Sequence, residues 1–118
     1  MAPAYSKNIL IVDDNFNIRE ILKNFLESCG FQIATARGAE EALRLLRKNF
    51  FTLMLTNYTM PGITGAELIS LVKENYPYLK VWGMSSLDRK EEFYQAGADF
   101  VLEKPFKFSQ LRALLKTV

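Results

Sequence analysis

The chain contains no histidine and a single cysteine, Cys29, among its 118 residues. Without histidine, neither an imidazole general base nor an imidazole metal ligand is available. One cysteine excludes a disulfide within the chain. A glycine-rich phosphate-binding loop is also absent, since only Asp13-Asp14-Asn15 follows the first apolar run. These absences argue against histidine-dependent enzymes, disulfide scaffolds and nucleotide-binding proteins that rely on such a loop.

Long apolar runs and concentrations of one charge are missing as well. No run approaches the roughly 20 residues that cross a bilayer, and residues 1–6 are too short and polar for a signal peptide. The 15 basic and 13 acidic residues are scattered and leave a formal net charge of +2. That charge gives no electrostatic case for direct binding of nucleic acid or membrane. We expect one cytoplasmic domain over residues 7–118, preceded by an N-terminal extension, residues 1–6.

Short apolar runs alternate with helical patterns along the rest of the chain. Asn8 to Val12 is nearly continuously apolar, which is typical of a parallel strand covered on both faces. From Asn17 to Cys29, apolar residues recur at helical spacing, and Asn17 with Glu20 resembles a capping box. The apolar positions of that helix are Ile18, Ile21, Leu22, Phe25, Leu26 and Cys29.

Five strand-then-helix units are predicted in this way. The strands cover 8–12, 31–36, 52–56, 80–84 and 100–102, and the helices cover 17–29, 39–48, 65–75, 88–97 and 108–116. Asp88 is expected to cap the fourth helix. This order predicts an α/β, flavodoxin-like, doubly wound (βα)5 three-layer sandwich with a five-stranded parallel sheet.

Polar side chains follow four of the five predicted strands. Asp13 and Asp14 follow the first, Asn57 the third, Ser85 the fourth and Lys104 the fifth. Ligands of such sheets bind beyond the carboxyl ends of the strands, so these side chains are expected to converge. Carboxylates suit Mg²⁺, and a lysine with a hydroxyl can stabilise a phosphoryl group. The central residue, however, is an amide, a far poorer nucleophile than a carboxylate.

The same residues form an ordered set of motifs: Val12-Asp13-Asp14, Asn57-Tyr58-Thr59-Met60-Pro61-Gly62, Met84-Ser85-Ser86 and Glu103-Lys104-Pro105-Phe106. On these motifs the chain resembles the receiver domains of two-component response regulators, the CheY-like superfamily. The resemblance runs from Lys7 to Val118.

The resemblance implies a Mg²⁺ site. Asp13, Asp14 and the residue at position 57 would hold the ion, and Thr59 would offer its backbone carbonyl. Because Asn57 replaces a carboxylate, the ligand charge falls and Mg²⁺ is expected to bind more weakly. In a metal-poor site, Lys104 is expected to pair with Asp13 or Asp14.

The resemblance also implies a phosphorylation site that has lost its acceptor. Asn57 occupies the phosphoacceptor position, Ser85 that of the switch hydroxyl and Lys104 that of the lysine that contacts the phosphoryl group. Val101 stands where the family usually places a switch tyrosine or phenylalanine. The resemblance therefore implies a signalling receiver and not an enzyme. As written, this receiver cannot be phosphorylated at Asn57. A natural pseudo-receiver and an Asp→Asn variant both remain open.

Two further residues are unusual on the fourth strand. Trp82 and Gly83 stand side by side there. The indole is expected either to fill the space that the glycine leaves or to lie near the signalling face. No chemistry is assigned to Tyr58, which follows Asn57 directly.

Partners follow from the resemblance as well. A histidine kinase or phosphotransfer protein would deliver the phosphoryl group, and a downstream protein would recognise the fourth helix, fifth strand and fifth helix. The cognate kinase, the output, the oligomeric state and whether the chain is cut from a longer regulator stay open. Two alternatives are a flavodoxin-like protein that binds a small ligand or nucleotide, and a metal-dependent phosphohydrolase using the acidic pair.

Overall fold

The structure, a computed structural model, describes residues 7–118 apart from the side chain of Leu87. The expected extension over residues 1–6 lies outside the described residues. Strands and helices alternate, in the order β1 (Asn8–Val12), α1 (Phe16–Ser28), β2 (Gln32–Ala36), α2 (Ala39–Lys48), β3 (Leu53–Asn57), α3 (Gly65–Asn75), β4 (Lys80–Ser85), α4 (Lys90–Ala96), β5 (Phe100–Glu103) and α5 (Phe108–Leu115). A 3-10 turn, η2 (Leu87–Arg89), precedes α4.

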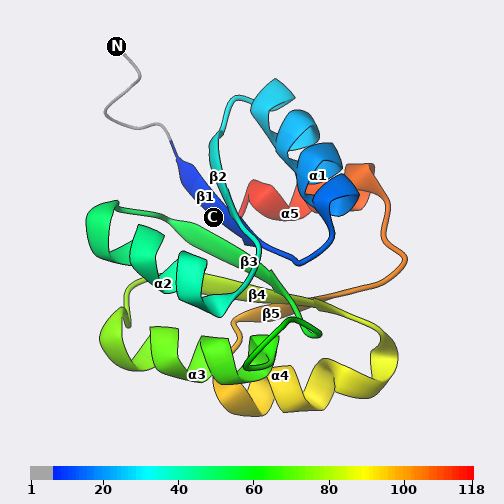
Figure 1. Cartoon of the computed structure of the whole chain (residues 1–118). Coiled ribbons are helices and arrows are strands. Elements are labelled where there is room, and N and C mark those ends of the chain that lie inside the picture. The colour runs from blue at the N-terminus through cyan, green and yellow to red at the C-terminus, as the bar shows by residue number, and fades with distance from the viewer. Residues whose placement is uncertain (1–6) are drawn as a thin grey trace.

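The strands form one parallel sheet in the order β2-β1-β3-β4-β5. Helices α1 and α5 lie on one side of this sheet, and α2, α3 and α4 lie on the other (Figure 1). The chain runs outward from β1 to β2 and then returns past β1 to β3. That reversal opens a crevice at the carboxyl ends of β1 and β3, where such folds bind ligands. The predicted doubly wound, flavodoxin-like fold is confirmed.

Two hydrophobic cores explain the nearly continuous apolar strands. Alternate residues of each strand face opposite sides of the sheet. Leu10, Met54 and Val101 belong to the core beneath α2, α3 and α4. Ile9 and Trp82 belong to the core beneath α1 and α5. Among residues 7–118, no helix is both long enough and apolar enough to cross a membrane.

Helix α1 differs from its prediction at the start and along one face. Asn15, and not Asn17, is the N-cap: its side chain accepts the backbone N–H of Ile18 at 3.0 Å. Arg19 is buried and donates to the backbone carbonyl of Asp13 at 2.8 Å. Two residues of the expected apolar face, Ile18 and Ile21, are 36% and 50% exposed. Helical spacing identified the apolar stripe, but only part of it is covered.

The prediction that Asp88 caps the fourth helix is wrong. Helix α4 begins at Lys90, after the 3-10 turn, and its N-cap residue Arg89 makes no capping hydrogen bond through its side chain. The Asp88 carboxylate instead accepts a hydrogen bond from the hydroxyl of Ser86. A serine two residues away competes successfully for the carboxylate, as short polar side chains do in turns.

Helix α3 starts in close contact with the end of β3. Thr64 and Glu67 form a capping box at its start. The next residue, Gly65, donates its backbone N–H to the carbonyl of Tyr58 at 2.7 Å. A Cβ on Gly65 would lie 2.0 Å from the backbone oxygen of Asn57. Only glycine therefore lets α3 approach the site strand this closely.

We predict that Gly65→Ser lowers the free energy of unfolding by about 1–3 kcal/mol, because backbone atoms must move to admit the side chain. Gly38→Ser is the matched control. Gly38 is the N-cap of α2 with extended backbone, and its Cβ would meet nothing closer than 3.9 Å. Serine is a good N-cap, so this control is expected to be unchanged or slightly more stable. Urea unfolding measures both, and equal losses would contradict the close-contact account.

Candidate functional site

The side chain of Asn57 joins the end of β3 to the segment after β5. Lys104 Nζ donates to Asn57 Oδ1 at 2.7 Å. Asn57 Nδ2 donates to the backbone carbonyl of Thr59 at 3.0 Å. Both ends of the amide are thus satisfied. The carbonyl expected to serve a metal ion accepts this amide N–H instead.

The prediction that Lys104 pairs with Asp13 or Asp14 is wrong. In the described part of the chain, Lys104 forms no ion pair, and its ammonium group bonds to the amide oxygen of Asn57. The reason is that an amide keeps the acceptor oxygen of a carboxylate while losing its charge. Lys104 therefore keeps a hydrogen-bond acceptor at position 57 and does not pair with Asp13 or Asp14.

Asp13 is a buried carboxylate at the end of β1, only 1% exposed. One carboxylate oxygen accepts the backbone N–H of Asn15 at 2.9 Å. The other, Oδ2, is buried without a hydrogen-bond partner among the described residues. Burial raises the pKa of Asp13 above its ordinary 3.8, although the Asn15 N–H and the Lys104 ammonium act in the opposite direction. The site thus holds a buried carboxylate oxygen that lacks a hydrogen-bond partner among the described residues.

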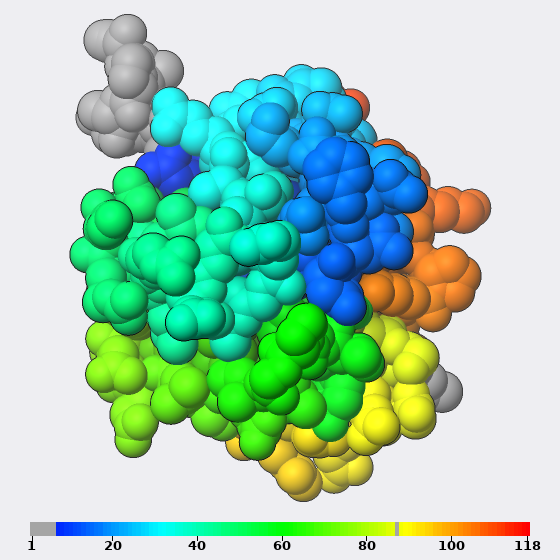
Figure 2. Space-filling view, in the orientation of Figure 1, coloured from blue at the N-terminus to red at the C-terminus, as the bar shows by residue number. Residues whose placement is uncertain are grey.

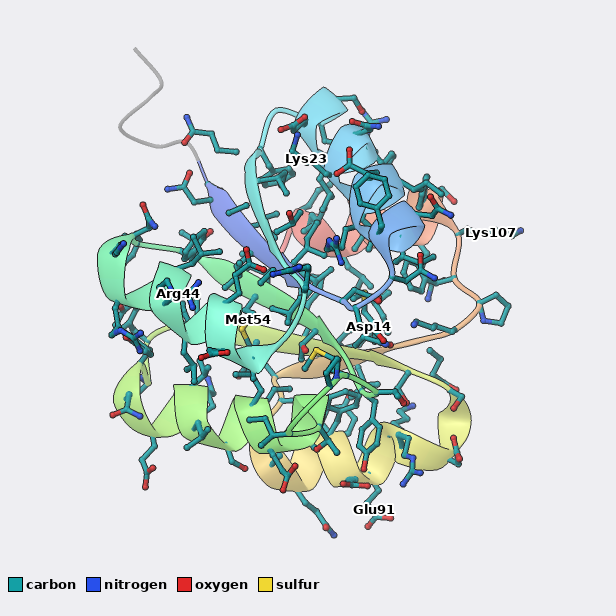
Figure 3. All side chains as sticks on the ribbon, in the orientation of Figure 1. Asp14, Lys23, Arg44, Met54, Glu91 and Lys107 are labelled. Atoms are coloured by element: carbon teal, nitrogen blue, oxygen red, sulfur yellow. The ribbon has the colours of Figure 1, made fainter. Side chains whose placement is uncertain are left out.

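These residues fit a magnesium ion with reduced ligand charge. Asp14 is exposed beside Asp13, and Figure 3 shows it at the turn between β1 and α1. The unpartnered Asp13 oxygen, the Asp14 carboxylate and the Thr59 carbonyl are hard oxygen donors of the kind that Mg²⁺ binds together with water. Residues 7–118 hold no cluster of three or more acidic, histidine or cysteine side chains. Only two carboxylates would therefore balance the charge of the ion.

Ser85 is at the site, but its hydroxyl points elsewhere. Its neighbour Met84 pairs with Asn57 across β3 and β4, and the Ser85 carbonyl accepts the backbone N–H of Lys104 at 2.8 Å. The hydroxyl, which is buried, donates to the carbonyl of Ser86 at 2.5 Å. Among the described residues it makes no hydrogen bond to Asn57 or Lys104. A side-chain rotation would be needed to bring it to a phosphoryl group.

Val101, at the expected switch position, is buried. It pairs with Gly83 across β4 and β5. The ring of Phe93, from α4, fills the space beside Gly83: a Cβ there would lie 2.6 Å from it. Trp82 faces the opposite core and packs edge-on against Phe100 at 5.7 Å. Of the two positions expected for the indole, the space beside Gly83 is wrong; the indole instead packs in the core with Phe100 of β5 and Leu115 of α5.

Tyr58, to which the sequence assigned no chemistry, contacts the start of α4 in three ways. Its hydroxyl donates to Glu92 Oε2 at 2.8 Å, which raises the pKa of Tyr58 above its ordinary value. The Arg89 guanidinium lies 4.5 Å from the centroid of its ring. The Phe93 ring meets it edge-on at 5.7 Å. The sequence signal is only an aromatic residue after Asn57, since its partners lie more than 30 residues away.

An apolar groove of about 540 Å³ adjoins the site between α1 and the segment after β5. Its lining residues are mostly apolar: Ile18, Ile21, Leu22, Met84, Lys104, Pro105, Phe106 and Phe108. Figure 2 shows the start of α1 (blue), the loop after β3 (green) and the segment after β5 (orange) gathered on one face. Helical spacing alone placed Ile18 and Ile21 in the core, so the sequence did not indicate this groove.

Comparison with known proteins gives a consistent result. The family model "Response regulator receiver domain" matches residues 9–116. The chemotaxis protein CheY of Pseudomonas aeruginosa is 34% identical over 116 residues, covering 93% of this chain and 94% of that protein. Response regulator protein FleR of the same organism is 35% identical over 113 residues, 93% of this chain. The chain spans only 23% of the length of FleR.

A solved structure with similar geometry is the response regulator protein TrrA of Thermotoga maritima. It has a TM-score of 0.88 and 32% sequence identity, and the match covers 94% of this chain and 97% of that one. TrrA was crystallised in complex with Mg²⁺ and BeF.

We predict that Asp13→Asn raises the free energy of unfolding at pH 7 in metal-free buffer. The raised pKa means that the folded chain binds the Asp13 proton more tightly than the unfolded chain does. The stability contributed by that proton is complete below pH 3.8 and is lost as pH rises through the folded-state pKa. The advantage of Asp13→Asn is therefore greatest above the folded-state pKa and shrinks as the pH falls toward 3.8.

Urea unfolding with a chelator at several pH values between 4 and 7 measures this difference. Asp14→Asn is the comparison variant: Asp14 is exposed, and because its charge helps to raise the pKa of Asp13, its removal is expected to give a smaller gain than Asp13→Asn. Adding Mg²⁺ is expected to stabilise the unaltered chain more than the Asp13→Asn chain. A loss of stability for Asp13→Asn at pH 7 without metal would contradict the account.

Proposed function

Because the chain belongs to the response-regulator receiver-domain family, we propose that it is a two-component signalling module whose phosphoacceptor is replaced by Asn57. The observation that carries this proposal is the contact between Lys104 and Asn57 Oδ1. It supports the proposal because the amide lies beside an ammonium group that would contact a phosphoryl group on a carboxylate at position 57. Asp13, Asp14, Thr59 and Ser85 take the metal and switch roles that the family resemblance implies.

The chemistry explains why the amide silences this site. In phosphoryl transfer to a carboxylate, an oxygen–phosphorus bond forms as the bond to the donor breaks, and the nucleophile loses no proton. The lone pair of an amide nitrogen is delocalised, and attack by the amide oxygen would leave a cationic group. Mg²⁺, when bound, would neutralise charge on the phosphoryl oxygens. Lys104 already donates a hydrogen bond to the residue at the acceptor position and would be a second cationic group beside the phosphoryl oxygens.

The output is proposed to be protein recognition by the surface of α4, β5 and α5, within the cytoplasm. On this surface Lys90 of α4 and Glu103 of β5 form an ion pair at 3.2 Å, and Tyr94 is exposed. In a receiver, phosphorylation shifts an equilibrium between two states of such a surface. Asn57 prevents that shift, so the surface is held in one state or is controlled by another input.

The input partner is proposed to be a histidine kinase or a phosphotransfer protein. Such a partner would transfer its phosphoryl group only to a form of this chain that has a carboxylate at position 57. Any donor must reach the position of Asn57 beside Lys104, which also lines the apolar groove. The groove, with Ile21 and Phe108 exposed, supplies apolar contact area beside that point. Phosphohydrolase activity and nucleotide binding are not favoured by any feature of the described residues.

We predict that Asn57→Asp gains a single phosphoryl group from phosphoramidate and Mg²⁺, whereas the unaltered chain gains none. The reason is that only the acceptor atom is missing from the site. Intact mass spectrometry measures the gain, and hydroxylamine should remove it, as expected of an acyl phosphate. A chelator is the control for the metal, and Asn57→Asp with Lys104→Met is the control for the lysine.

Two results would count against the proposal. If neither chain is labelled, then the whole site has lost its chemistry and not merely its acceptor. If the unaltered chain is labelled as fully as Asn57→Asp, then Asn57 does not silence the domain.

A further inference from the structure

We infer that Tyr58 couples the acceptor site to α4, in place of the missing aromatic residue at position 101. The inference rests on the proposed function, since it concerns how the state of that same site would reach the signalling surface.

The β5 position is unable to report the state of the site. Val101 is 3% exposed and packs in the core beneath α4. Its backbone N–H donates to the hydroxyl of Tyr94 at 3.2 Å, which ties β5 to α4 at this point. Phe93, fully buried, fills the space beside Gly83 on the neighbouring strand. No room remains there for a side chain that moves between buried and exposed positions.

Tyr58 is connected directly to the atoms that would change with the state of the site. It lies between Asn57 and Thr59, which are joined by a hydrogen bond at 3.0 Å to the same Thr59 carbonyl that is expected to serve a metal ion. On its other side, the Tyr58 carbonyl accepts the N–H of Gly65, so α3 anchors the backbone. Because α3 holds the backbone at Gly65, a movement of the loop at Asn57 and Thr59 is expected to displace the Tyr58 side chain.

The Tyr58 side chain contacts α4 and the turn before it through three different kinds of interaction. The hydroxyl donates to Glu92, the ring face meets the Arg89 guanidinium and Phe93 packs edge-on. A cation above a ring and an aromatic pair each favour a defined ring position. Movement of the ring therefore changes three contacts at once, at the end of α4 nearest the site.

Removal of Tyr58 should leave α4 folded. Arg89 and Glu92 also bond to each other at 3.4 Å without the tyrosine. Phe93 keeps its place beside Gly83, and the Lys90–Glu103 ion pair still joins α4 to β5. These contacts allow coupling to be tested separately from stability.

The test compares hydrogen exchange over α4, residues 90–96, in the unaltered chain and in the Asn57→Asp chain. Asn57→Asp removes the amide donor to Thr59, so it perturbs the loop without any ligand. We expect a several-fold change in the exchange rates of α4. We expect this change to be lost when Tyr58→Leu is present in both chains, and reduced when Tyr58→Phe is present.

Tyr94→Phe is the matched control. It also removes a tyrosine hydroxyl from a bond that ties α4, but the bond reaches β5 and not the site loop. The response of α4 to Asn57→Asp should survive Tyr94→Phe. Urea unfolding of each variant checks that the domain remains folded. Loss of the response with Tyr94→Phe, and not with Tyr58→Leu, would place the coupling in β5 and overturn the inference.

Beryllofluoride with Mg²⁺, a mimic of the phosphoryl group, provides the second arm in the Asn57→Asp chain. Calorimetry measures its binding, and hydrogen exchange over α4 is measured separately. We expect Tyr58→Leu to abolish the α4 response while beryllofluoride still binds. If beryllofluoride does not bind at all, the proposed function fails, but the ligand-free comparison still decides the inference. An α4 that responds fully in the Tyr58→Leu background, or not at all with Tyr58 present, overturns it.

Discussion

The hydrogen bond from Lys104 to Asn57 is the interaction on which the arrangement of the site depends. It joins segments 47 residues apart and ties the end of the central strand β3 to the end of β5. The Asn57 amide contributes its oxygen to this bond and its N–H to Thr59. An amide can do both without a metal ion, whereas a carboxylate has no N–H to donate. The Asn57 and Lys104 side chains thus bond to each other, while the buried Oδ2 of Asp13 has no hydrogen-bond partner among the described residues.

The fold and the location of the site could be predicted from the sequence, because both follow from order along the chain. Continuous apolar strands separated by amphipathic segments allow few arrangements other than a parallel sheet. In a parallel sheet, residues that follow strands must meet at one edge. Asp13, Asn57 and Lys104 were therefore expected together before any contact was known. Their expected roles as metal ligand, acceptor and phosphoryl contact remain proposals.

What the sequence did not predict depends on choices among competing partners. Lys104 could bond to a carboxylate or to an amide oxygen, and distance along the chain does not decide between them. Asp88 could cap a helix or accept from Ser86, which is nearer. Ile18 and Ile21 have the spacing of core residues, but the groove beside them remains open. In each case the local pattern was correct in kind, and the tertiary neighbour determined the result.

The packing of Phe93 beside Gly83 has a consequence for how this domain can vary. The atoms at positions 83, 93 and 101 share one space between β4, β5 and α4, and protein interiors leave little slack. A larger residue at one of these positions therefore requires a smaller one at another. Among related chains, the three should vary jointly, with alanine or serine at 83 accompanied by a side chain smaller than phenylalanine at 93. An aromatic residue at position 101 would then require a residue smaller than phenylalanine at position 93 of α4.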